Sequence, residues 1–122
     1  MSKEYEFLKE CGAFFVLTVK ENSPIGRPFG AVMELDNNLY IATSDIKAVY
    51  EQIINNPNVQ IAALESGTRE WIRISGIAEE CTDIATKQKM LDECPILLKH
   101  YASADTPHYN IFKITVNDSQ LN

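Results

Sequence analysis

The chain has 122 residues, of which 45% are hydrophobic and 23% charged, and its formal charge at pH 7 is −6. This composition is typical of one soluble globular domain over residues 1–122. The acidic surplus excludes a broad nucleic-acid surface, which needs clustered Lys and Arg. No apolar run approaches the roughly 20 residues of a membrane span, and residues 1–6 lack the pattern of a signal peptide. We therefore expect a cytoplasmic protein with no membrane or nucleic-acid partner.

The size of the domain limits where a ligand could bind. By surface-area scaling, about two thirds of the extended chain's surface is buried on folding, which leaves one modest core. A pocket for a drug-sized ligand, on the order of 300–1,000 Å³, would occupy much of that core. We therefore expect a ligand site at an edge of the domain or between subunits.

The first half of the sequence predicts a short helix and three strands. The helix ends at Gly12, a residue that favours helix termination. Runs of β-branched and aromatic residues, separated by turn residues such as those at 36–38, predict the strands. The expected elements are a helix at Tyr5–Cys11 and strands at Ala13–Val19, Arg27–Leu35 and Leu39–Thr43. Short connections between successive strands predict an antiparallel meander.

The second half begins with a clear helical pattern. Apolar residues recur at Ile46, Val49, Tyr50, Ile53 and Ile54, which form one stripe of a helix, and residues 55–57 (Asn-Asn-Pro) end it. The later elements are strands at Asn58–Leu64 and Trp71–Ala78, a helix from Thr82 or Asp83 to about Asp92, a short helix within Pro95–Tyr101, and a strand at Ile111–Val116. Six mainly antiparallel strands with peripheral helices predict a small β-barrel, since closure removes exposed edges.

Lys47 is the first candidate binding residue. It is predicted in the first turn of a helix, where the helix dipole disfavours a cation. A bound anion would reverse that effect, and the free N–H groups of the helix start could hold a phosphate together with Lys47 and the hydroxyls of Thr43 and Ser44. The alternative is that Ser44 or Asp45 caps the helix and that Lys47 is a solvated surface residue.

The strand at residues 71–78 supplies a second candidate surface. Alternation places Ile72, Ile74, Gly76 and Ala78 on the core face, and Trp71, Arg73 and Ser75 on the other face. An aromatic, a cation and a hydroxyl on one face would suit a planar aromatic ligand with an anionic tail. Arg73 could equally pair with Glu70 or Glu65 on a solvated face.

Other chemistries have little support in the sequence. Neither histidine, His100 or His108, lies in a nucleophile-like motif. The three cysteines are widely spaced with no CxxC, which fits a reducing compartment and argues against disulfides or a zinc site. The glycine-rich GxGxxG and GxxxxGK[ST] motifs are absent, so Rossmann and P-loop sites are not predicted.

Four segments in a fixed order resemble the pyridoxamine 5′-phosphate oxidase-like flavin-binding split barrels. The resemblance extends from Phe14 to Val116 and is closest to the small general stress and nitroimidazole-resistance-like members. The segments are Arg27–Gly30 (RPFG), Leu39–Val49 (LYIATSDIKAV), Asn56–Val59 (NPNV) and Trp71–Gly76 (WIRISG). The C-terminal Trp and Arg of the full-length oxidases have no counterpart in residues 117–122, so we do not expect the vitamin B6 reaction.

The resemblance implies a six-stranded antiparallel split β-barrel of Greek-key type with peripheral helices. It implies a homodimer that binds one FMN in each of two interface grooves and passes electrons between a donor such as NAD(P)H and a small planar substrate. The implied ligands are Arg27, Lys47, Thr43 and Ser44 for the phosphate, the backbone of Pro28, Phe29 and Gly30 for the flavin ring edge, and Trp71 and Arg73 from the facing region. The chain's three arginines and Lys47 would then gather around one dianion.

Relatives on the same barrel bind deazaflavin or haem, which leaves both as alternative cofactors. Haem would require an axial ligand, for which His100 and His108 are the candidates. A carrier or sensor that binds flavin or haem without turnover is the alternative to an oxidoreductase.

Overall fold

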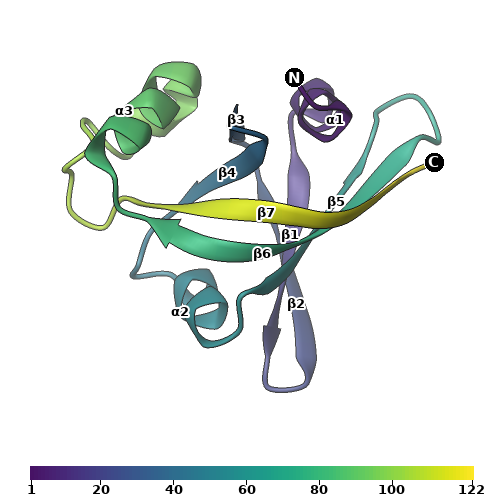
Figure 1. The fold of residues 1–122 in the computed structure, drawn as a ribbon, viewed down its shortest axis with the longest axis horizontal. Helices are drawn as coiled ribbons and strands as arrows, with labels where there is room; N and C mark the ends of the chain where they lie inside the picture. The colour runs from purple at the N-terminus through teal and green to yellow at the C-terminus, as the bar shows by residue number, and fades with distance from the viewer.

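The computed structural model describes all 122 residues as one curved antiparallel sheet with helices against it (Figure 1). The elements are α1 (Lys3–Cys11), β1 (Phe14–Lys20), β2 (Ser23–Phe29), β3 (Met33–Leu35), β4 (Asn38–Thr43), α2 (Ala48–Asn55), β5 (Asn58–Leu64), β6 (Trp71–Cys81), α3 (Ile84–Glu93), the 3-10 helix η1 (Pro95–Lys99) and β7 (Asn110–Leu121). The mainly β fold with peripheral helices confirms the predicted class. None of the helices is both long and apolar enough to cross a membrane.

The sheet has seven strands, one more than predicted, in the order β2-β1-β5-β6-β7-β4-β3. The additional strand arises because the expected strand at Arg27–Leu35 is two separate strands. Ala31, Val32 and Met33 are all buried, and three consecutive buried residues break the alternation that one continuous strand requires. Residues 30–32 therefore leave β2 and lead into β3.

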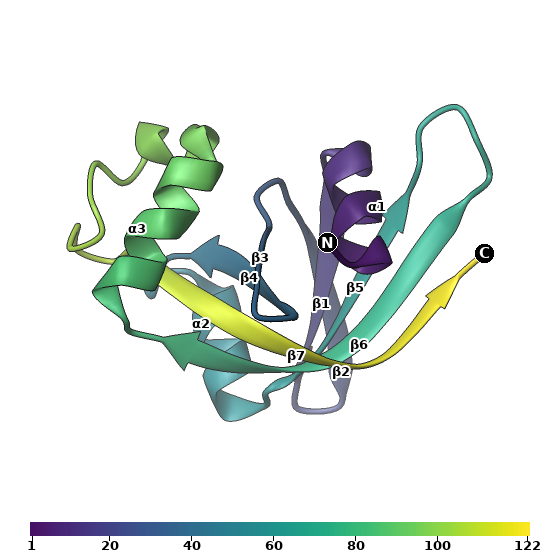
Figure 2. The same cartoon turned by 45° about the horizontal axis from the view of Figure 1, so that its top comes forward.

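The predicted meander of the first three strands is wrong for the same reason. β2 pairs only with β1, whereas β3 pairs with β4, and β4 pairs with β7 near the other edge of the sheet. The chain thus passes from one edge of the sheet to the opposite edge between Phe29 and Met33. Figure 2 shows β1 and β2 crossing the long, curved β6–β7 pair.

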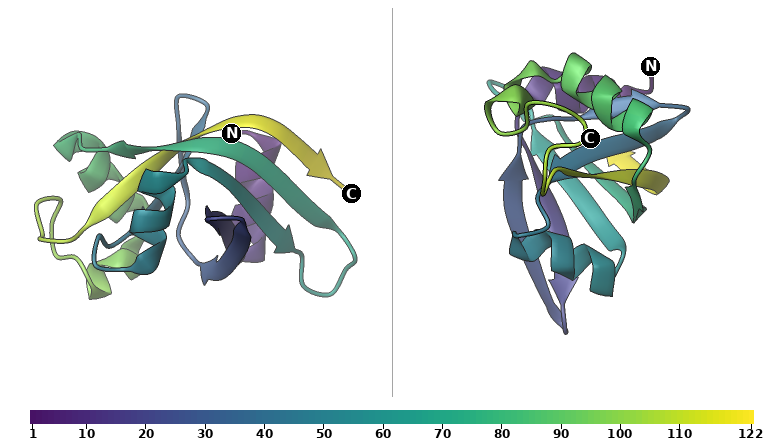
Figure 3. Two further views of the ribbon diagram at one scale, coloured as in Figure 1. Left: turned by 90° about the horizontal axis from the view of Figure 1, so that it is seen from below. Right: turned by 90° about the vertical axis from the view of Figure 1, so that its left-hand side faces the viewer.

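The core face of β6 is the predicted one. Ile72, Ile74, Gly76 and Ala78 are buried, and the residues between them are partly or fully exposed. A main cluster of 17 buried residues packs α1 and α2 against the sheet, and a second cluster of nine lies beneath α3 and η1. Figure 3 shows that α2 and α3 lie at the same end of the molecule.

The helix after β4 begins later than its pattern predicts. Lys47 is the N-cap of α2 and is not in its first turn, while Ile46 lies before the helix and is 74% exposed. Neither Ser44 nor Asp45 caps the helix, because the segment from Ser44 to Lys47 forms a separate turn in which the Lys47 N–H donates to the Ser44 carbonyl oxygen. Val49 and Ile53 face the core as expected, together with Gln52, but Ile54, which the predicted stripe also includes, is 54% exposed.

Candidate functional site

A groove of about 250 Å³ lies between β2, β4, the start of α2 and η1. It brings together six of the nine predicted site residues, from three separate segments of the sequence. The lining residues are Arg27, Pro28, Phe29, Gly30, Ala31, Ala42, Thr43, Lys47, Val49, Ile96, Leu97 and His100. Two of the groove's side chains, Arg27 and Lys47, are cationic at neutral pH.

Arg27 is held in place by the strand and helix beside it. Its Nη1 donates to the Val16 carbonyl oxygen at 3.1 Å and to Thr18 Oγ1 at 2.8 Å, and its Nη2 donates to Gln52 Oε1 at 2.6 Å. Burial lowers the pKa of the guanidinium from its usual value, but an arginine stays protonated in proteins. Three of its five N–H donors are used within the chain, and two have no partner in it.

Lys47 lies where α2 begins, and this helix start has no side-chain cap. The N–H groups of the first turn of a helix attract anions, because they have no partner within the helix and carry the positive end of its dipole. Lys47 is exposed and makes no ion pair in the chain. An uncapped helix start beside a free ammonium is a favourable place for an anionic group.

Thr43 and Ser44, the two predicted hydroxyl ligands, differ in their position relative to the groove. Both residues are buried, but only Thr43 lines the groove. Ser44 Oγ accepts from the Ile46 N–H at 3.4 Å and so takes part in the turn itself. The Thr43 carbonyl oxygen accepts from the Tyr101 hydroxyl at 3.3 Å, and burial is the main cause that raises the pKa of Tyr101.

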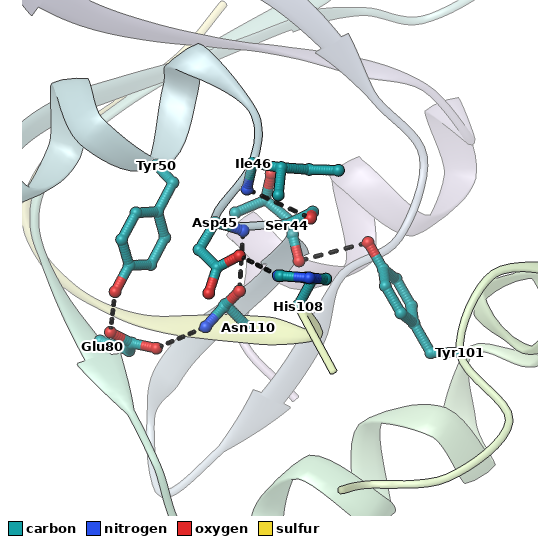
Figure 4. Close-up of polar contacts among 9 residues, drawn as sticks. Ser44, Asp45, Ile46, Tyr50, Glu80, Tyr101, His108 and Asn110 are labelled. Carbon is teal, nitrogen blue, oxygen red and sulfur yellow. Dashed lines mark hydrogen bonds and ion pairs between the residues drawn. The ribbon is translucent and has the colours of Figure 1, made fainter. Parts of the chain in front are cut away.

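A polar network attaches this turn to the end of the sheet (Figure 4). Asn110 accepts from the Asp45 N–H and donates to Glu80 Oε2, both at 2.8 Å. The other Glu80 oxygen accepts from the Tyr50 hydroxyl at 2.5 Å, and this bond, with burial, raises the pKa of Tyr50 to about 12. His108 Nδ1 lies 2.7 Å from Asp45 Oδ1 on the outer side of the turn.

Trp71 and Arg73 do not lie in this groove of the same chain. They line a second, apolar groove of about 450 Å³ on the outer face of β1, β5 and β6, with Phe15 and Leu64. Arg73 lies over the Trp71 ring, 5.6 Å from its centroid, and its Nη2 donates to Gln120 Oε1 at 2.7 Å. Neither alternative partner, Glu65 or Glu70, is within ion-pair distance of it.

The third arginine also lies apart from the groove. Arg69 is exposed in the loop between β5 and β6, at the opposite end of the molecule from α2 and α3 (Figure 1). Within one chain, therefore, the groove contains Arg27 and Lys47 but neither Arg69 nor Arg73.

Three groove residues come from a segment that sequence reasoning did not place there. Ile96, Leu97 and His100 belong to η1 and its C-cap, which the second core cluster packs beside the end of β4. Ile96 is 56% exposed in the structure, but no pattern in the sequence marks these residues as part of a groove. His108, the other histidine, is bound to Asp45 outside the groove.

Comparison with known proteins decides the family. The family model described as pyridoxamine 5′-phosphate oxidase matches residues 2–121. The chain belongs to the pyridoxamine 5′-phosphate oxidase family. No curated relative matches the sequence of this family member.

Solved structures of similar proteins agree with this assignment to the oxidase family. A NimC/NimA family protein from Clostridium acetobutylicum superposes with a TM-score of 0.92 at 32% identity, covering 98% of this chain and 85% of the other. General stress protein 26 from Bacillus anthracis has a TM-score of 0.81 at 21% identity, covering 96% and 88%. A protein from Mesorhizobium loti named as FAD-binding has a TM-score of 0.71 at 20% identity, covering 99% and 94%, and shares the fold.

Proposed function

We propose that this protein is an FMN-dependent oxidoreductase that acts as a homodimer, with one flavin in each of two grooves between the subunits. Membership of the oxidase family and a structural neighbour named as FAD-binding support a flavin. The single observation that carries the proposal is that two cationic side chains, Arg27 and Lys47, line one groove beside the uncapped start of α2.

The donor set fits the phosphate of FMN. A phosphate dianion accepts several hydrogen bonds, and the two unused donors of Arg27, the Lys47 ammonium and the first N–H groups of α2 can supply them. Thr43 lines the same groove as Arg27 and Lys47. Ser44 would act by shaping the turn, because its hydroxyl is buried and accepts from Ile46.

The ring of the flavin would lie along the backbone of Pro28, Phe29 and Gly30. Phe29 is held by stacking on Phe14, with ring centroids 6.3 Å apart, so this wall of the groove is anchored to the core. When bound, a flavin supplies the electron-transfer chemistry, and the protein supplies binding, orientation and a defined polarity. A site of this kind needs no acid–base pair among its side chains.

The dimer explains why one chain holds only part of the site. The groove of about 250 Å³ is smaller than the roughly 300–1,000 Å³ of a typical ligand pocket. On the outer sheet face, Phe15 is 53% exposed and Leu64 is 64% exposed, next to Trp71 and Arg73. A second copy would cover this apolar face, and Trp71 and Arg73 would complete the partner's groove.

The proposal is tested with the purified protein and added FMN. We expect the absorption bands of oxidised flavin, saturable FMN binding, and bleaching of those bands by NADH or NADPH when a small planar acceptor is absent. A colourless protein that binds no FMN would overturn the proposal. A Soret band, or specific binding of a deazaflavin, would replace FMN by one of those cofactors, and bound flavin that no donor reduces would indicate a carrier or sensor.

A further inference from the structure

Asn110, the first residue of β7, makes side-chain bonds that pairing of the sheet does not require. Its backbone already pairs with Thr43 in the β4–β7 register. Its side-chain amide, which is buried, reaches beyond the strand: Oδ1 accepts from the Asp45 N–H and Nδ2 donates to Glu80 Oε2 (Figure 4). The amide oxygen and the amide nitrogen are therefore both hydrogen-bonded, and the oxygen binds Asp45, which lies outside the sheet.

Glu80 extends this connection to α2. One carboxylate oxygen accepts from Asn110 and the other accepts from the Tyr50 hydroxyl in the first turn of the helix. Asp45 and Tyr50 lie on either side of Lys47 in the sequence, so the Asn110–Glu80 pair holds the chain before and after this lysine. We refer to these two side chains as the Asn110–Glu80 clamp.

The lysine between the two anchors has no such restraint. The Lys47 side chain is exposed and makes no hydrogen bond or ion pair within the chain. The position of its ammonium, and of the N–H groups at the start of α2, depends on where the backbone of residues 45–50 is fixed. A binding group has to be held within about 0.5 Å of its productive position, and the clamp contacts the turn on both sides of Lys47.

We propose that Asn110 is a positioning residue for phosphate recognition, acting through the Asn110–Glu80 clamp to hold Lys47 and the start of α2 at the groove. This inference rests on the proposed FMN site and identifies a determinant of affinity for the phosphate. Asn110 does not line the groove and would contact no part of the ligand. Its loss should therefore weaken the binding of FMN selectively, and riboflavin, which lacks the phosphate, should be affected much less.

An exchange of amide and carboxylate tests the clamp. Asn110→Asp keeps an oxygen for the Asp45 N–H but places a second carboxylate against Glu80, and like charges at this distance repel. We expect the Kd for FMN to rise about tenfold, the effect of about one hydrogen bond to a binding element. Adding Glu80→Gln restores a donor opposite the new carboxylate, keeps an oxygen for Tyr50 and returns the net charge to its original value, so the double variant should recover FMN affinity.

Glu79→Gln is the matched control for Glu80→Gln, because it removes one negative charge from the neighbouring residue of β6. Glu79 is exposed and 3.6 Å from Lys113, away from the clamp, so FMN affinity should not change. Melting temperatures and the Kd for riboflavin are measured for every variant. The positioning role is overturned if FMN and riboflavin lose affinity equally, if Asn110→Asp leaves the preference for FMN unchanged, or if a folded double variant does not recover it.

The two proposals fail in different ways. A wild-type protein that binds no FMN would refute the proposed function itself. A wild-type protein that prefers FMN over riboflavin, with the same preference in Asn110→Asp, would refute only the role of Asn110. If Asn110→Asp fails to fold, Glu80→Gln alone decides. Its single amide oxygen can accept from Asn110 or from Tyr50 but not from both, so the preference for FMN should fall, and an unchanged preference would overturn the role of Asn110.

Discussion

The Arg27 guanidinium donates to Gln52 Oε1 at 2.6 Å, and the same oxygen accepts from the Thr18 hydroxyl at 2.6 Å. The arginine therefore joins β2 to α2 across a partly buried polar contact, in addition to facing the groove. This double role separates Arg27 from Lys47, which has no partner in the chain, and it makes their substitutions distinguishable.

Arg27→Ala should lower both FMN affinity and stability. The loss of charge-assisted bonds to the phosphate should cost about 1.5–3 kcal/mol of FMN binding, and riboflavin binding should fall far less. The Val16 carbonyl oxygen also loses its side-chain donor, so the free energy of unfolding should fall by about 1–3 kcal/mol. Fluorescence titration with both ligands and denaturant unfolding of the apoprotein measure the two effects. Equal losses for FMN and riboflavin would show that Arg27 does not hold the phosphate.

Lys47→Ala should weaken FMN binding without affecting stability. The ammonium is exposed and unpaired, so its removal leaves no buried group without a partner, while the cost to FMN binding should again be about 1.5–3 kcal/mol. The same titrations and unfolding curves apply, and Lys20→Ala, another exposed lysine outside the groove, serves as the control. A drop in stability comparable to that of Arg27→Ala would contradict this account of Lys47.

Phe15→Glu should dissociate the proposed dimer. Phe15 is 53% exposed and lines the apolar outer groove, so a carboxylate there would be buried without a partner in the proposed dimer. Light scattering should give about twice 13.8 kDa for the wild type and about 13.8 kDa for the variant, with a parallel loss of FMN binding. Ile84→Glu, at an equally exposed residue on α3, is the control and should remain dimeric. A wild-type monomer that binds FMN tightly would contradict a site shared between subunits.

Tyr50 predicts how stability changes at alkaline pH. The pKa of Tyr50 is raised to about 12 in the folded chain because Glu80 accepts from its hydroxyl and because it is partly buried, whereas an unfolded tyrosine titrates at about 10. Between these values the unfolded chain binds fewer protons, so the free energy of unfolding should fall as pH rises through this window and should be unaffected below it. Unfolding curves across the window should be less pH-dependent for Tyr50→Phe. An unchanged slope would mean that the other tyrosines with raised pKa account for all of the effect.

Gly76 occupies a position that no side chain fits. A Cβ there would lie 2.7 Å from both Ile114 Cγ2 and the Thr115 carbonyl oxygen, at the irregularity in β6–β7 pairing between Ser75 and Gly76. Gly76→Ala should lower the free energy of unfolding by about 1–3 kcal/mol, because the clash includes backbone that cannot move without disturbing the sheet. Thermal unfolding of both variants measures this, and Gly26→Ala, where a Cβ would have ordinary contacts, should change stability much less.

The spacing of apolar residues correctly predicted those features of the fold that depend on residues close together in the sequence. The alternation from Trp71 to Ala78 gave the buried face of β6 correctly, and the apolar stripe through Val49 and Ile53 gave the buried face of α2. The break at residues 30–32 was not predictable in this way. Arg27–Leu35 has strand-forming residues throughout, and its division depends on pairing with β1 at one end and β4 at the other.

The predicted site residues fall into two groups for a similar reason. Arg27, Thr43 and Lys47 meet because β2, β4 and α2 converge at one groove. The alternation in the sequence places Trp71 and Arg73 on the outward face of β6, but it does not predict which groove these residues line. Within one chain they lie elsewhere, and their part in the site depends on the proposed partner subunit.

The passage of residues 30–32 between the two edges of the sheet means that β2 and β3 are not hydrogen-bonded to each other. The groove lies along this open seam, with β2 on one side and β4, next to the other edge strand, on the opposite side. A ligand that contacts both sides would act as a removable link between the edges. Its binding energy would then add to the cost of local opening, and amide hydrogen exchange should slow most around Phe29–Met33 when the ligand is present.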